Sequence, residues 1–176
     1  MRRGDPSGRP GRAEPGPYDA SAVARERFGR EHPNVLLQSF AIQNLSRELL
    51  QRAFAGLPID PRDWGVLSVL RAFGPQTPTA LASFLGMAPT TLSSTIARLS
   101  RRRLVRKRRN PDDGRSYLLE VSAPGLALIE RVGPSFRDAL QRLNEELGEG
   151  REDILDAQAV LTEALRRALA GTPNSK

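Results

Sequence analysis

The chain has 176 residues, which suits one domain or one domain with tails, and its formal net charge of +7 favours a polyanionic partner. It has no cysteine, which excludes disulfides, thiolate metal sites and cysteine nucleophiles, and its single histidine, His32, cannot form a histidine-rich metal site. No apolar run is long enough to span a bilayer and the N-terminus lacks the apolar segment of a signal peptide, so we expect a cytoplasmic protein with no cofactor, no metal and no membrane partner.

The N-terminal residues are expected to add little to the fold. Residues 1–17 contain four prolines, four glycines and four arginines, so they bury too little apolar surface to offset the entropy of ordering and form a disordered tail. Residues 18–33 are expected to hold a short helix, from Asp19 to Glu31, which Pro33 ends.

Two longer helices are expected next. Apolar side chains recur at helical spacing from Asn34 to about Ala55, and this pattern predicts the first of them. Asp60 and Pro61 supply an N-cap and a favoured first position for the second helix, which is expected to end near Gly74.

A helix-turn-helix is predicted after these helices. Thr77 and Pro78 start a short helix that ends at Gly86, and a further helix runs from Pro89 to about Arg103. Two short helices joined by a tight glycine-containing turn form the unit whose second helix enters the major groove of DNA.

The second of these helices has the composition of a recognition helix. Leu92, Ile96 and Leu99 form its apolar stripe, and its opposite face carries small, hydroxylic and arginine side chains. Such a face suits base edges in the major groove, but it equally suits an ordinary amphipathic helix with a solvated polar face. The residues predicted to contact DNA from the helix-turn-helix are Thr79, Pro89, Thr90, Thr91, Ser94, Arg98 and Arg101.

A basic β-hairpin is predicted directly after the recognition helix. Seven of the nine residues 101–109 are basic, and the expected strands cover residues 106–109 and 116–121, on either side of a turn over 110–114. A charge run is usually a solvated face, but its position between a helix-turn-helix and a hairpin favours a wing that follows the DNA backbone. The predicted wing contacts are Arg106, Arg108, Asp113 and Arg115, with Arg115 in the minor groove and Asp113 paired to its guanidinium.

The C-terminal region is expected to be helical over residues 125–170, with a kink at Pro134 and a break near residues 147–150. Its apolar side chains, together with those of the first long helix, form more apolar surface than a single wing motif covers. They either pack within one chain or meet those of a second chain.

Residues 77–125 resemble the winged helix-turn-helix of the MarR family of bacterial regulators. The wing motif of the family, Asp-x-Arg after a proline-containing turn, appears as residues 113–115, and the Leu-Val pair after the recognition helix appears as residues 104–105. The Thr-x-x-Gly that closes the wing is matched by residues 122–125. The chain departs from the family in having no glycine before the Leu-Val pair and no hydroxyl that caps the recognition helix.

The resemblance extends over about residues 34–170 and implies a mainly α fold with a small β-hairpin wing. The winged helix-turn-helix DNA-binding domain would cover residues 59–124, and residues 34–58 and 125–170 would form a helical dimerisation region. A two-fold dimer presents two recognition helices to successive major grooves, so half-sites about 10 bp apart are expected.

The resemblance therefore implies a sequence-specific regulator of transcription, a ligand- or stress-responsive repressor that binds a pseudo-palindromic operator in double-stranded DNA as a homodimer. It also implies a pocket for a small aromatic effector, for which Phe40, Trp64 and Phe136 are the candidate lining residues. The alternative is a dimeric winged-helix interaction module or antirepressor without its own operator. No enzyme is expected, because no nucleophile–base pair or phosphate loop has a supporting context.

Overall fold

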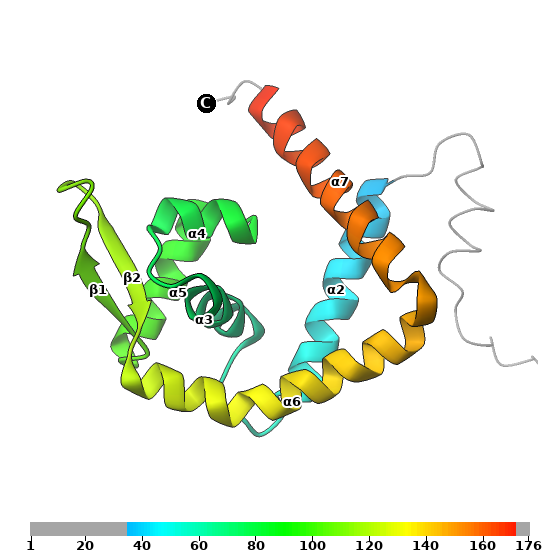
Figure 1. Ribbon diagram of the computed structural model, residues 1–176, viewed down its shortest axis with the longest axis horizontal. Helices are drawn as coiled ribbons and strands as arrows, with labels where there is room; N and C mark the ends of the chain where they lie inside the picture. Colours follow the sequence, from blue (N-terminus) through cyan, green and yellow to red (C-terminus); the bar gives the residue numbers. More distant parts are fainter. Residues whose placement is uncertain (1–34, 172–176) are drawn as a thin grey trace, which may run out of the picture. The chain divides into compact units, whose positions relative to one another are not determined.

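A computed structural model describes residues 35–171 of the chain (Figure 1). The chain divides into two compact units, Met1–Asn44 and Leu45–Lys176, and of the first unit only residues 35–44 are described. The tail expected over residues 1–17 and the helix expected over 18–33 lie outside the described residues.

Helix α2 (Val35–Ala53) begins in the first unit and ends in the second. It confirms the helix predicted over residues 34–55. None of its 19 residues is buried, although large apolar side chains recur along its whole length. Near the end of the helix, Leu50 and Ala53 pack against the core and are partly buried, whereas the large apolar side chains between Val35 and Leu45 are exposed.

Three shorter helices form the centre of the second unit: α3 (Pro61–Phe73), α4 (Pro78–Leu85) and α5 (Pro89–Arg101). Each begins with a proline at its first position, where no backbone N–H is needed. The Asp60 carboxylate accepts a hydrogen bond from the Arg62 N–H at 2.8 Å, and the Thr77 hydroxyl accepts one from the Ala80 N–H at 3.1 Å. These caps fix where α3 and α4 begin.

The hairpin pairs β1 (Val105–Arg109) with β2 (Tyr117–Val121) in antiparallel register, from Val105 opposite Val121 to Arg109 opposite Tyr117. Gln76, in the loop before α4, adds a bridge to Leu119 through two backbone hydrogen bonds of 3.0 and 2.8 Å. The hairpin is therefore fixed to the helices at its centre, and it projects beside them in Figure 1.

The C-terminal part consists of α6 (Ala123–Leu147), a short 3-10 turn (Gly148–Gly150) and α7 (Arg151–Gly171). The predicted break near residues 147–150 is confirmed. Pro134, where a kink was predicted, lies inside α6, which continues through it as one helix. No residue of α7 is buried.

A single hydrophobic core holds α3, α4, α5, the hairpin and the first half of α6 together. Its fully buried side chains include Leu67, Leu81, Leu92, Leu99, Leu119 and Val132. The first turn of α6 enters this core at Gly125, where an added Cβ would lie 2.1 Å from the carbonyl oxygen of Leu104. The fold is mainly α with a small β-hairpin, as predicted. No helix among the described residues is long and apolar enough to cross a membrane.

Candidate nucleic-acid interface

Helix α5 presents a small and hydroxylic face to solvent. Its buried side chains are Leu92, Thr95, Ile96 and Leu99, which puts the predicted apolar stripe against the core. Of the predicted contact residues on this helix, Pro89, Thr90, Ser94 and Arg101 are exposed and Thr91 is half-buried. Thr79, in the first turn of α4, is also exposed. The solvent side of the helix-turn-helix thus carries these side chains.

Arg98 does not share that arrangement, although it was predicted to face DNA. Its guanidinium forms a bidentate ion pair with the Asp63 carboxylate of α3, with Nε–Oδ1 at 3.0 Å and Nη2–Oδ1 at 2.5 Å. Asp63 is only 1% exposed. The Arg98 side chain is half-buried, because the buried carboxylate draws this long side chain inward rather than toward solvent.

A second arginine joins the same carboxylate. Arg102 approaches Asp63 Oδ2 at 3.4 Å and also donates to the carbonyl oxygen of Pro58. The hydrogen bond from Arg98 to Asp63 raises the pKa of the Arg98 guanidinium further above its ordinary value, with a smaller opposing effect from burial. Asp63 therefore anchors the recognition helix to α3 through two fixed cations.

The sequence alone does not mark Asp63 as a functional residue. At the third position of α3 it resembles any acidic residue in a first helical turn, where carboxylates are common. Its burial is the informative property, and the signal for it in the sequence is its place on the same helical face as the core residue Val66.

The hairpin divides its basic residues into two groups. Arg106 is paired with Glu120 on the facing strand at 2.6 Å, and the Lys107 ammonium lies 4.4 Å from the centre of the Tyr117 ring. Arg106 was predicted to contact DNA, and the structure gives it a partner within the sheet. Within residues 101–115, the exposed arginines without an ion pair to a described residue are Arg101, Arg103, Arg108, Arg109 and Arg115.

The tip of the hairpin is held by backbone contacts. The prediction that Asp113 pairs with the Arg115 guanidinium is wrong for this structure: Asp113 Oδ1 accepts from the Arg115 backbone N–H at 2.9 Å. An Asp side chain that bonds the backbone two residues on is a common turn device, and it is more local than an ion pair between flexible ends. The Arg115 side chain is left exposed at the tip.

The turn between α5 and β1 closes through an arginine in the left-handed conformation. Arg103 has φ of 57° and is the sole non-glycine residue with a positive φ within residues 35–171. The backbone N–H groups of Arg103 and Leu104 donate to the carbonyl oxygens of Ser100 and Leu99, both at 2.9 Å. This bonding pattern is a helix-ending motif that normally uses glycine.

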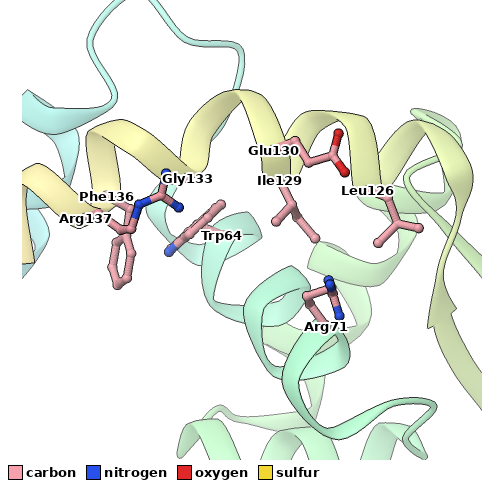
Figure 2. A pocket seen from close by; sticks show the side chains of 8 residues that line it. All are labelled: Trp64, Arg71, Leu126, Ile129, Glu130, Gly133, Phe136 and Arg137. Atoms are coloured by element: carbon pink, nitrogen blue, oxygen red, sulfur yellow. The ribbon is translucent and has the colours of Figure 1, made fainter.

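A pocket of about 510 Å³ lies between α3 and α6 (Figure 2). Its lining residues are Trp64, Arg71, Leu126, Ile129, Glu130, Gly133, Phe136 and Arg137. Trp64 is itself a buried core residue, 5.6 Å from the ring of Phe54 and 5.1 Å from that of Phe136. Phe40 is exposed in the other compact unit, so its place at a pocket stays a prediction. No cluster of potential metal ligands occurs in the part of the chain that the structure describes.

Residues 57–116 match the model of the MarR family. The chain is 31% identical over 127 residues to the uncharacterized HTH-type transcriptional regulator Mb0904 of Mycobacterium bovis, an alignment that covers 72% of this chain and 88% of that protein.

Solved structures share the fold. A mutant of MarR from E. coli, complexed with operator DNA, matches with a TM-score of 0.62 at 20% identity over 82% of this chain and 96% of that one. The PcaV transcriptional regulator of Streptomyces coelicolor, in complex with its natural ligand, matches with a TM-score of 0.56 at 26% identity over 80% of this chain and 94% of that one.

Proposed function

The chain belongs to the MarR family of transcriptional regulators, and on that premise we propose that it represses transcription as a homodimer bound to a pseudo-palindromic operator in double-stranded DNA. It works in the cytoplasm, where the operator is, and it needs no catalytic activity for this role. Repression of this kind depends on the DNA-contacting residues and on the dimer, and an effector relieves it by releasing the DNA.

One observation above all supports DNA binding: exposed arginines without an ion pair to a described residue adjoin the solvent-exposed face of α5. Arg101 at the end of that helix, Arg108 and Arg109 in the hairpin and Arg115 at its tip are exposed and have no acidic partner among the described residues. A polyanion that lies along this face meets hydroxyls and free guanidinium groups together, which suits base edges and phosphates. Recognition-helix contacts are assigned to Thr90, Thr91 and Ser94, with Pro89 and Thr79 beside them.

Two of the arginines predicted to contact DNA have a different role in the proposal. Arg98 and Arg106 hold their own carboxylates, Asp63 and Glu120, and a guanidinium in a bidentate or short ion pair has fewer N–H groups left for a base. We therefore assign them to the support of α5 and of the hairpin rather than to direct contact.

Dimerisation is supported by the apolar surface of the end helices. No residue of α2 or α7 is classed as buried, although helices of 19 and 21 residues gain most of their stability when an apolar face packs against another surface. The large apolar side chains that are exposed on these two helices include Phe40, Leu45, Leu155 and Leu169. A second copy of the chain supplies the same surface by symmetry.

The pocket between α3 and α6 supports an aromatic anion as the effector. Arg71 and Arg137 bring two positive charges to its lining against one carboxylate, that of Glu130, while Trp64 and Phe136 provide ring surface (Figure 2). Flat aromatic walls with a few convergent charged groups are typical of sites for small organic anions. PcaV, whose structure holds its natural ligand, supports a ligand-binding role for this fold.

A mobility-shift titration tests the proposal. The probe is the DNA upstream of the chain's own gene, at two salt concentrations, because phosphate contacts release counterions and make specific binding fall steeply with salt. Arg115→Ala is expected to weaken the specific complex about tenfold or more.

Arg142→Ala is the matched control, since it removes an exposed arginine from α6 and leaves the hairpin intact. Equal losses from both variants would mean that net charge alone matters. A wild-type protein that binds this DNA no more strongly than random DNA would favour the interaction-module alternative.

A further inference from the structure

Asn110 is the buried polar residue of the wing. It is 7% exposed, whereas the five residues that follow it, 111–115, are all exposed. Both ends of its amide are used: Nδ2 donates to the Ser116 hydroxyl at 2.7 Å, and Oδ1 accepts from the Asp112 N–H at 3.1 Å. Asn110 thus joins the two strand ends across the base of the loop.

Ser116 links Asn110 to the tip of the loop through hydrogen bonds to Asp113. Its backbone N–H donates to the carbonyl oxygen of Asp113 at 3.1 Å, and its hydroxyl donates to the same oxygen at 3.3 Å. Asp113 in turn accepts the Arg115 N–H through its carboxylate at 2.9 Å. The hydrogen bonds form a chain from Asn110 through Ser116 and Asp113 to the backbone of Arg115.

Apolar packing has little part in the shape of this loop. Residues 111–115 are exposed, and a Cβ added at Gly114 would meet no atom within 4 Å. Ordering a free chain costs conformational entropy at every residue, so a loose five-residue loop would lose much of its binding free energy when it enters a groove. Hydrogen bonds that order the loop beforehand remove that loss.

We propose that Asn110 is a positioning residue for DNA binding: it closes the wing loop and thereby presents Arg115, without touching the DNA itself. The inference rests on the proposed DNA-binding function. Asn110 holds the loop, Ser116 and Asp113 relay its position, and Arg115 makes the contact.

A double-mutant cycle separates this role from general stability. Asn110→Ala is expected to weaken binding to the specific duplex about tenfold, because the loop must then be ordered at the moment of binding. In an Arg115→Ala background the same substitution is expected to change affinity less than about twofold, because the contact that it positions is already absent. If the loss of affinity in the double variant equals the product of the two single losses, the proposal is overturned.

The preference of the protein for one DNA sequence over another is a second measurement, and a residue with only a structural role would not change it. If Arg115 enters a narrow minor groove, Asn110→Ala reduces the preference for A·T-rich over G·C-rich sequence at the wing position, whereas Arg142→Ala leaves that preference unchanged. Ser116→Thr, which keeps the hydroxyl, is expected to bind like the wild type, and Ser116→Ala like Asn110→Ala.

Backbone amide exchange tests the loop without DNA. In Asn110→Ala the amides of Asp112, Arg115 and Ser116 are expected to exchange faster, while the melting temperature stays close to that of the wild type. Unchanged exchange at all three amides refutes the role of Asn110 whatever the DNA result. A different result counts against the proposed function instead: the loop amides exchange as expected in the wild type and in Asn110→Ala, but neither protein forms a specific complex with DNA.

Discussion

Among single residues, the Asp63 carboxylate determines how the recognition helix is held. It is almost completely buried, and its two partners, Arg98 and Arg102, are each about a third exposed. Burying a carboxylate is costly unless cations and hydrogen bonds compensate it. Both cations come from α5 and the residue after it, so α5 cannot shift against α3 without leaving this charge uncompensated.

Asp63→Asn is expected to lower the free energy of unfolding by about 2 kcal/mol, because the amide keeps the shape of the site but loses the charge that both guanidinium groups bind. Urea-induced unfolding followed by Trp64 fluorescence measures the change, since that side chain is next in sequence and buried. Asp138→Asn removes a carboxylate of α6 that forms no ion pair with another described residue, and it is expected to change stability by less than about 0.5 kcal/mol.

The stability that the Arg98–Asp63 ion pair provides through the guanidinium is expected to be independent of pH near neutrality. The hydrogen bond to Asp63 raises the pKa of Arg98 in the folded protein, so its contribution is fully present below the ordinary pKa of arginine and is lost only at strongly alkaline pH, as the pH rises through the raised value. An unfolding free energy that fell between mildly acidic and mildly basic pH in the wild type, but not in Asp63→Asn, would contradict this account.

Among the helices and turns, the starts of helices are predictable from sequence because their causes are local. Asp60 and Thr77 cap the helices that follow them through bonds two or three residues away, and prolines mark the first positions. The ion pair between Arg98 and Asp63 is not predictable, because 35 residues separate the partners and only the packing of α5 on α3 brings them together.

The wing tip shows that a local contact can also be predicted wrongly. Asp113 and Arg115 do interact, but through the Asp113 carboxylate and the Arg115 backbone N–H rather than through the guanidinium. Opposite charges two residues apart are evident in a sequence, whereas the turn geometry that brings a carboxylate to a backbone amide is not.

The junction of α5 with β1 gives a prediction about backbone strain. Arg103→Gly is expected to raise the free energy of unfolding by about 1 kcal/mol, because a side chain at a left-handed φ is strained and glycine is not. Arg102→Gly is the matched control: it removes an arginine one residue earlier, at a right-handed φ of −80° and in contact with Asp63, and is expected to destabilise. Thermal unfolding of both variants makes the comparison, and a loss of stability in Arg103→Gly would mean that its side chain contributes more than its backbone costs.

For the molecule as a whole, the proposed function depends on a contact that one chain cannot make alone. The second unit has a well-packed core, whereas α7 has only exposed or half-buried residues. An apolar helix side left open to water favours association, at about 25 cal/mol for each Å² covered. Two chains joined through such helices hold two recognition helices at one spacing, and that spacing selects the distance between operator half-sites.

Leu169 and Val160 allow this dependence to be tested within one helix. They are nine residues apart, so at about 100° per residue they lie on opposite sides of α7. Both are well exposed in a single chain, 75% and 69% respectively, so replacing either by glutamate leaves the core of the chain untouched. Leu169 is on the side that carries Leu161 and Leu165, which are the half-buried residues of the helix.

Leu169→Glu is therefore expected to shift the protein from dimer to monomer in sedimentation at micromolar concentration, because a dimer would bury two unpaired carboxylates at its interface. Val160→Glu is expected to remain dimeric. DNA affinity should follow the same division, since a monomer binds one half-site and loses the gain in effective concentration that the second provides. If the two variants sediment alike, the side of α7 that carries Leu169 is not the dimer contact, and the half-site spacing must be set by another surface.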